Sequence, residues 1–248
     1  MSSKVQQAVR NNAYWCDTVC RAQSIPGEFH NHLWLNHHPV PRFYPNAVTL
    51  SGAEGIVEQQ TALQVLITEG ALSGLAVKDS FCTLDLAPLG FQLLFEATWL
   101  WRAPAPPEPI AEMIGIQWAT IHQSLELARW ETAWNGLADE ASALPARIFP
   151  ASLLDDEDLV FIAAYRGRHI VAGAIANRTG EVVGLSNVFA PPVEASRFWA
   201  GCVTAAGRAF PGLPLVGYER GEELIMARQQ GFEAVGPLRV WARENSAG

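Results

Sequence analysis

Residues Leu213-Pro-Leu-Val-Gly-Tyr-Glu219 read as a short apolar strand that ends in a phenol and a carboxylate. A helical segment follows, Glu222-Glu-Leu-Ile-Met-Ala-Arg-Gln-Gln-Gly-Phe232, and its glycine predicts the end of that helix. A second strand then closes the chain at Leu238-Arg-Val-Trp241. The order strand, helix, Gly-Phe and strand predicts a mixed α/β domain at the end of this protein.

Three further strands are predicted upstream, at Leu159–Tyr165, His169–Asn177 and Val182–Phe189. The segments between them are short, polar and contain glycine, so we expect the three strands to form an antiparallel meander. Pro191-Pro192 ends the third strand, because proline has no N–H group to donate to a neighbouring strand.

Helices are predicted on both sides of this meander. An amphipathic helix from Glu194 to Phe210 leads into the strand at Leu213–Tyr218, which we therefore expect to pair in parallel with a meander strand. Before the meander, the same periodicity predicts a strand at Gly115–Ile121 and an amphipathic helix at Gln123–Gly136.

A proline-rich segment divides the chain near its middle. Arg102-Ala-Pro-Ala-Pro-Pro-Glu-Pro109 cannot be helical and favours an extended spacer. We therefore predict an N-terminal half at residues 1–103, a linker at 104–110 and a C-terminal domain at 111–248.

The first half contains a fainter copy of the chain's ending. A strand, a helix and a strand are predicted in a row, at Ala47–Leu50, Ala53–Glu69 and Leu72–Lys78. Gly90-Phe91 then precedes a last strand at Leu93–Arg102, as a Gly-Phe pair does in the second half. The sequence therefore predicts a duplicated strand-helix-strand-Gly-Phe-strand unit.

The composition limits the class of protein. A chain of 248 residues with 49% hydrophobic and 17% charged residues can bury one large core or two smaller ones. A net charge of -8 provides no basic surface for nucleic acid or an anionic membrane. No apolar run approaches the roughly 18–20 residues that cross a bilayer, and the N-terminus lacks the apolar core of a signal peptide. With four scattered cysteines, we expect a soluble cytoplasmic protein with reduced thiols.

Together these elements resemble the GNAT acyltransferase superfamily. Their order over about Ile110–Arg243 looks like one GNAT domain, and Glu222–Phe232 is similar to the last helix of that superfamily with its Gly-Phe end. The resemblance implies an α/β (α+β) fold with a mixed, mostly antiparallel sheet flanked by helices. The first half then looks like a degenerate second copy, as in tandem members.

The resemblance also implies where acetyl-CoA or another acyl-CoA would bind. In that family, backbone N–H groups of a strand hold the pantetheine arm, and the N-terminus of the following helix holds the pyrophosphate. The corresponding positions here are Asn187, Val188 and Phe189 on the strand, and Ala195, Ser196 and Arg197 at the helix start.

Two features depart from the family pattern. No glycine lies between Ala190 and Trp199, although glycine lets the backbone of such a turn close on phosphates. The usual acid, a tyrosine five residues before the Gly-Phe phenylalanine, is replaced by Ala227. Tyr218 and Glu219 are the candidate substitutes, as a phenol and as a base that acts directly or through water. A tyrosine and a glutamate at a strand end are equally compatible with an ordinary surface.

A histidine-rich stretch supplies a rival site, with His30, His32, His37 and His38. Together with Cys16 and Cys20 upstream, it has ligand types that zinc prefers. Alternation along a strand at His30–Leu35 would place the first two histidines on one face. The spacing matches no zinc signature, so we assign no metal, and the cysteine pair is equally compatible with a helix core.

The leading hypothesis is an acyl-CoA-dependent N-acyltransferase acting on a small amine or amino acid, without nucleic acid or membrane partners. The alternative is a catalytically degenerate GNAT-fold module that binds a ligand or a protein. An open cleft beside Val188 would favour transfer. A cleft filled by Phe189, Phe198 or Trp199 would favour the module. The sequence does not indicate the oligomeric state.

Overall fold

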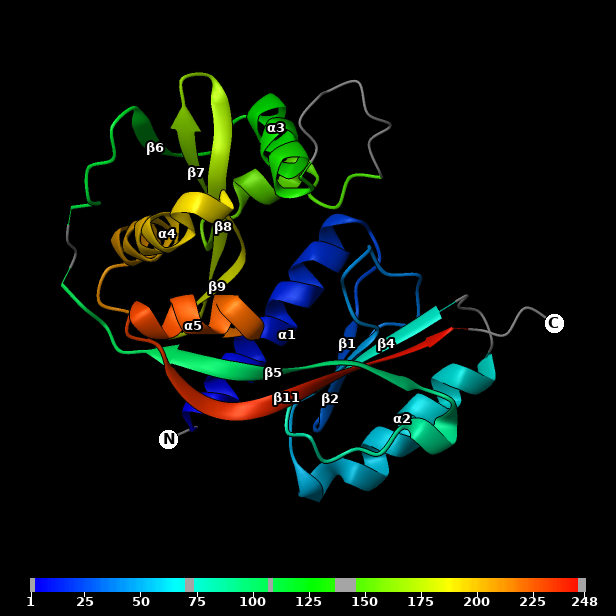
Figure 1. The fold of residues 1–248 in the computed structure, drawn as a ribbon. Helices are drawn as coiled ribbons and strands as arrows, with labels where there is room; N and C mark the ends of the chain where they lie inside the picture. The colour runs from blue at the N-terminus through cyan, green and yellow to red at the C-terminus, as the bar shows by residue number, and fades with distance from the viewer. Residues whose placement is uncertain (1–2, 70–73, 107–108, 137–145, 245–248) are drawn as a thin grey trace. The chain divides into compact units, whose positions relative to one another are not determined.

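The computed structural model describes residues 3–69, 74–106, 109–136 and 146–244 (Figure 1). The chain divides into two compact units, one from residues 1–99 together with 234–248 and the other from residues 100–233. The closing strand thus belongs with the N-terminal residues, whereas the sequence placed it in a domain at 111–248. Sequence order alone does not reveal a chain that returns to its first unit.

The second unit is built on the predicted meander. Its strands β6 (Ile116–Thr120), β7 (Leu159–Arg166), β8 (His169–Thr179) and β9 (Val182–Phe189) pair in this order, each antiparallel to the next. Gly167 and Gly180 form the two tight turns with φ of 63° and 59°, a left-handed conformation that glycine adopts without strain. β10 (Leu215–Glu219) then pairs with β9 in parallel, which confirms the prediction.

Three helices accompany this sheet, namely α3 (Ser124–Trp134), α4 (Ala195–Ala209) and α5 (Gly221–Gln229). Short 3-10 turns, η3 (Ala151–Asp155) and η4 (Pro192–Glu194), precede β7 and α4. All three helices were predicted, because each carries an apolar stripe or a glycine end that sequence periodicity reveals.

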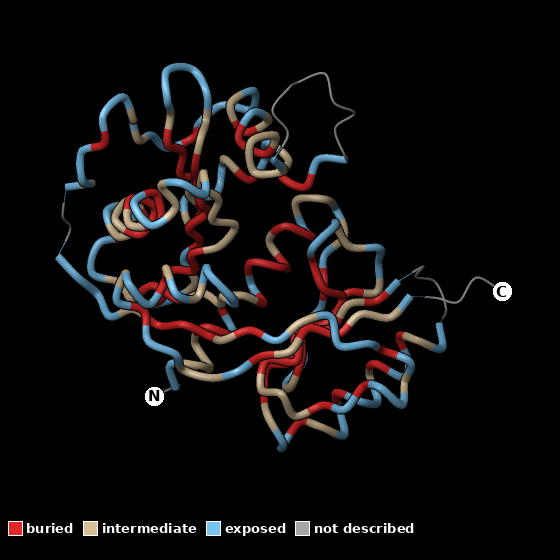
Figure 2. Tube along the Cα trace, viewed as in Figure 1, coloured by how far each residue is buried: buried red, intermediate tan, exposed pale blue. Residues whose placement is uncertain are grey.

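The helices α3 and α4 cover opposite faces of the sheet. Ile162 belongs to a core cluster with α4 residues such as Cys202, and Figure 2 shows α4 buried along one side and exposed along the other. The neighbouring Phe161 contacts Trp130 of α3, with 5.4 Å between ring centroids. Since successive side chains of a strand point to opposite faces, α3 and α4 lie on the two sides of β7.

The first unit begins with a helix that the sequence did not predict, α1 (Lys4–Ala22), followed by the short strands β1 (Glu28–Phe29) and β2 (Leu33–Leu35). The remaining elements are β3 (Ala47–Thr49), η1 (Ala53–Gly55), α2 (Ile56–Glu69), β4 (Gly74–Asp79), η2 (Ala87–Leu89), β11 (Glu233–Glu244) and β5 (Gln92–Arg102), which passes into the second unit at Leu100. The predicted strand-helix-strand is confirmed, with β3 and β4 in parallel, although the start of the predicted Leu72–Lys78 strand lies outside the described residues.

The closing strand β11 pairs with β4 in the antiparallel direction, from Arg239↔Asp79 to Glu244↔Gly74. The core of this unit includes Leu63 of α2, Val77 of β4 and Trp241 of β11. Residues from both ends of the chain therefore bury one apolar surface together. None of the helices in the described part of the chain is long and apolar enough to cross a membrane.

Candidate functional site

The parallel strands β9 and β10 separate towards their ends. They pair through Leu215↔Val183 and Val216↔Gly184, and within the described residues their pairing stops there. At Gly217 the strands are still close, because a Cβ there would lie 2.8 Å from the carbonyl oxygen of Leu185. Beyond this point β9 continues to Phe189 and β10 to Glu219, and the described residues show no shared register between the two strands there.

A β-bulge in β9 accompanies this separation. Two neighbouring pairs of this ladder are Ile175↔Ser186 and Gly173↔Phe189. Between these two pairs β9 contains one residue more than β8. The extra residue is accommodated at Asn187, whose φ of 53° is left-handed, a conformation that asparagine tolerates better than most residues. A bulge bends its strand and interrupts the hydrogen-bonded ladder. The end of β9 is therefore free to turn away from β10.

A cavity of about 720 Å³ opens at this end of β9, and we name it the β9 cavity. Among its lining residues are the predicted cofactor positions Val188, Phe189, Ala195, Ser196 and Arg197, whereas Asn187 is not among them. Its other wall comes from α5, through Glu222, Glu223, Ile225, Met226 and Gln229. Sequence reasoning missed this wall, although the helix that directly follows β10 was the available signal.

Aromatic side chains do not fill the β9 cavity. The ring of Phe189 packs edge-on against Trp130 on the α3 side of the sheet, with 5.2 Å between ring centroids. Phe198 is fully buried beside Trp118, with 6.2 Å between ring centroids. Trp199 contributes to the cavity wall and packs against Phe232. These three aromatic side chains therefore leave the cleft beside Val188 open.

The start of α4 carries an ion-pair cluster. Glu194 accepts hydrogen bonds from Arg166 at 2.8 Å and from Arg197 at 3.3 Å, so two guanidinium groups offset its charge. Ser196 donates from Oγ to Oε1 of Gln229 at 3.2 Å, which links α4 to α5 across the cavity wall. No side chain caps α4 among the described residues.

Tyr218 and Glu219, the predicted catalytic pair, are both partly buried at the end of β10. Side chains alternate along β10, and Leu215 lies in the core with α4. Glu219, four residues on, therefore faces the α4 side of the sheet, whereas Tyr218 faces the opposite side. Burial raises the pKa of Glu219 to about 8, and the negative charge of Glu223 contributes to the same shift. Glu219 is therefore mostly protonated at neutral pH, and the deprotonated form, which is the one that can act as a general base, grows as the pH rises through about 8.

The β9 cavity fits one part of an acyl-CoA and not another. Beyond Gly184 the described end of β9 has no register with β10, and a backbone edge of this kind suits a neutral, amide-containing pantetheine arm. The turn before α4 has no glycine, and the cavity is lined by Glu194, Glu222 and Glu223 against Arg197. A carboxylate and a phosphate charge about 6 Å apart repel each other by about 1 kcal/mol in water and by about 3 kcal/mol near a protein surface. The residues present do not fit the pyrophosphate.

The histidine-rich stretch does not form the strand that was predicted at His30–Leu35. His30 and His32 lie in the turn between β1 and β2, where the His30 N–H donates to the Leu33 carbonyl at 2.8 Å. Alternation along one strand therefore does not apply to them, since the chain reverses direction there.

The polar groups of this stretch are engaged locally. Nδ1 of His32 lies 2.7 Å from Oγ of Ser51, and Nδ1 of His37 lies 3.0 Å from a carboxylate oxygen of Glu69. Cys16 and Cys20 are buried on α1, and burial raises the pKa of the Cys20 thiol to about 12. Throughout the described ranges, no group of three or more His, Cys, Asp or Glu side chains could hold a metal ion.

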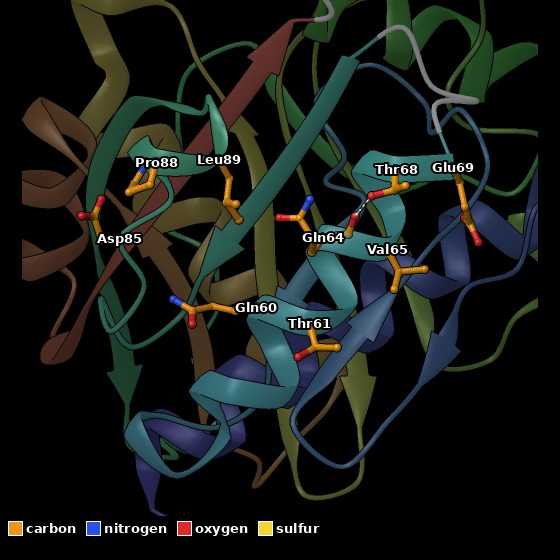
Figure 3. A pocket seen from close by; sticks show the side chains of 9 residues that line it. All are labelled: Gln60, Thr61, Gln64, Val65, Thr68, Glu69, Asp85, Pro88 and Leu89. Atoms are coloured by element: carbon orange, nitrogen blue, oxygen red, sulfur yellow. Dashed lines mark hydrogen bonds between the residues drawn. The ribbon is translucent and has the colours of Figure 1, made fainter.

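A second cavity, of about 700 Å³, lies in the first unit between α2 and the segment at 85–89 (Figure 3). Its wall is formed by Gln60, Thr61, Gln64, Val65, Thr68, Glu69, Asp85, Pro88 and Leu89, and none of these is a predicted site residue. The hydroxyls of Thr61 and Thr68 donate to backbone carbonyls of α2 at 2.7 Å, so they are directed at their own helix. The carboxylates are engaged too, Glu69 with His37 and Asp85 with the Ala87 N–H. This cavity gathers no group poised for proton transfer.

Comparison with solved structures places this architecture among known proteins. No protein-family model and no curated protein matches the chain. A functionally unknown conserved protein from Staphylococcus epidermidis matches with a TM-score of 0.64 at 10% identity, over 88% of this chain and 93% of that one. A GCN5-related N-acetyltransferase from Kribbella flavida matches with a TM-score of 0.60 at 14% identity, over 97% and 96%. A tandem GNAT protein from the clavulanic acid biosynthesis pathway matches with a TM-score of 0.54 at 14% identity, over 87% and 79%.

These similarities extend over most of the chain. At such identities they establish the fold alone. The mixed, mostly antiparallel sheet flanked by helices that the sequence predicted is confirmed. This chain has the fold of the GCN5-related N-acetyltransferases.

Proposed function

We propose that the second unit transfers an acyl group from a pantetheine thioester, such as acetyl-CoA, to a small amine or amino acid. The observation that carries this proposal is the β9 cavity, which is lined by the bulged end of β9, the start of α4 and the helix α5, with no β10 residue in its lining. A fold resemblance alone would not support an activity, whereas a cavity of this size supplies a binding site. The proposed setting is the cytoplasm, where the four free cysteines would stay reduced.

Glu219 is the proposed base. An amine attacks a thioester carbonyl only as its free base, so its ammonium must first lose a proton. A carboxylate with a pKa of about 8 is matched to that task, because catalytic efficiency is greatest when the pKa lies near the operating pH. The amine nitrogen then bonds to the carbonyl carbon, the carbon–sulfur bond breaks, and the departing thiolate takes a proton. The nitrogen gives up its second proton as it becomes the amide, and this proton replaces the one donated to the thiolate. Tyr218, on the other face of β10, is the proposed donor of the proton to the thiolate.

The first unit is, in this proposal, a degenerate copy that has lost the cleft. Its strands β3 and β4 flank α2 as β9 and β10 flank α4, and both pairs are parallel. Hydrogen bonding ties the ends of β3 and β4 together, because the Ser80 N–H donates to Oγ1 of Thr49 at 2.8 Å. At the start of α2, a Cβ on Gly55 would lie 2.8 Å from His32, so side chains already occupy that space. A donor would have no room there.

The second candidate is a non-catalytic ligand-binding or protein-interaction module. It is favoured by the turn before α4, which lacks glycine and contains Pro191 and Pro192, and by the acidic lining of the β9 cavity. Both features weaken binding of the nucleotide part of an acyl-CoA.

The purified full chain, incubated with acetyl thioesters and a panel of primary amines and amino acids, tests the proposal. We expect an acetylated product by mass spectrometry together with release of a free thiol. Glu219→Gln should lower kcat by about 10²–10⁴-fold. Asp85→Asn, in the first unit, serves as the control. If no thioester yields product and none shifts the thermal unfolding midpoint, the module is the correct assignment.

A further inference from the structure

We infer that the β9 cavity recognises its acyl donor through the pantetheine arm and not through the nucleotide. This inference rests on the proposed transferase function and defines its donor class. A short pantetheine thioester would then serve about as well as the corresponding acyl-CoA. Three observations carry it: the backbone of the turn before α4, the charges around the cavity, and the character of its remaining walls.

The turn before α4 has few N–H groups to offer a phosphate. Pro191 and Pro192 have no N–H at all. The Glu194 N–H donates back to the Pro191 carbonyl at 3.2 Å, and the Ala195 N–H donates to the Pro192 carbonyl. A phosphate-binding turn works through several backbone N–H groups that converge on the anion, usually at glycines. Here two of the donors are missing, at Pro191 and Pro192, and two are engaged within the turn, at Glu194 and Ala195.

The charges around the cavity also oppose a nucleotide. Glu222 and Glu223 face it from the first turn of α5, where they interact favourably with their own helix dipole. Arg197, the arginine of the lining, is held by Glu194 and reaches the Glu112 carbonyl at 3.5 Å. Arg166 is also engaged with Glu194. A pyrophosphate would have to displace these ion pairs while it approached two carboxylates.

The remaining walls suit a neutral chain. Val188, Trp199, Ile225 and Met226 provide apolar surface on both sides of the cavity. A pantetheine arm combines apolar methylenes with amides, whereas an adenosine diphosphate does not.

The test compares S-acetyl-pantetheine with acetyl-CoA on the full chain, with one amine acceptor. We expect the two donors to give kcat/KM values within about tenfold of each other, since the nucleotide adds little net binding. A preference for acetyl-CoA of more than about 100-fold would overturn the inference while leaving the transferase function in place. Product from neither donor would overturn the proposed function and this inference with it.

A charge variant sharpens the comparison. Glu222→Gln removes one carboxylate that faces the cavity and leaves Glu223, the neighbour that acts on Glu219, in place. The ratio of kcat/KM for acetyl-CoA to that for S-acetyl-pantetheine should rise about threefold or more, and added salt should raise it in the wild type. Glu181→Gln, at an exposed turn of the same unit, is the matched control. An unchanged ratio in Glu222→Gln contradicts the charge argument.

Discussion

Replacing Glu219 by glutamine should make the protein more stable at high pH and change its stability little at low pH. Burial beside Glu223 raises the pKa of Glu219 to about 8 from an ordinary value of 4.5, so the folded chain binds this proton more tightly than the unfolded chain. The stability that this group contributes is therefore fully present below pH 4.5 and is lost as the pH rises through about 8.

The size of the effect follows from the two pKa values. At about 1.36 kcal/mol per pKa unit, the complete loss amounts to roughly 5 kcal/mol, of which roughly 4 kcal/mol falls between about pH 5 and about pH 9. Glutamine keeps the shape of the protonated carboxyl and is neutral throughout this range. The free energy of unfolding of Glu219→Gln, minus that of the wild type, should therefore grow by roughly 4 kcal/mol from about pH 5 to about pH 9.

Urea unfolding followed by tryptophan fluorescence at about pH 5, 7 and 9 measures this difference. Glu181→Gln, an exposed carboxylate in the same unit, controls for the general change in charge. Glu223→Gln should lower the pKa of Glu219 and with it the pH dependence, because it removes the neighbouring negative charge. A difference that stays constant with pH, or one equal to that of the control, would refute the reasoning.

Three further predictions concern interactions within each of the two units. Gly201→Ala in α4 should destabilise the protein by about 1–3 kcal/mol in urea unfolding, because the new Cβ would overlap the ring of Trp118. Gly207→Ala, in the same helix, is the control: its Cβ would enter open space, so it should stabilise the protein by up to about 1 kcal/mol. Asp17→Ala should cost about 2–4 kcal/mol, since Asp17 is buried and accepts a backbone and an indole N–H at 3.0 Å each; an equally stable variant would contradict this. Deleting residues 234–248 should abolish the hydrogen-exchange protection of β4 amides in the first unit, and unchanged protection would show that β11 is not needed there.

Local sequence patterns predicted most elements of the second unit. The meander, α4 and the parallel strand β10 all follow from signals that act over a few residues, namely apolar periodicity, glycine turns and the proline pair at the end of β9. The helix α1 was missed, although the stripe of Trp15, Cys16 and Val19 that it buries was present in the sequence. The predicted strand at His30–Leu35 failed because a hairpin turn, and not a continuous strand, occupies its start.

Sequence by itself determined the order of these elements and the absence of glycine from the turn before α4. Tertiary structure alone decided the features on which the proposed chemistry depends. The bulge at Asn187 arises from the register between β8 and β9, and the acidic wall from the packing of α5 beside α4. The raised pKa of Glu219 likewise exists only where the fold removes its carboxyl from water and sets Glu223 nearby. Each of these depends on how strands pair and helices pack in three dimensions, which apolar periodicity and turn residues do not specify.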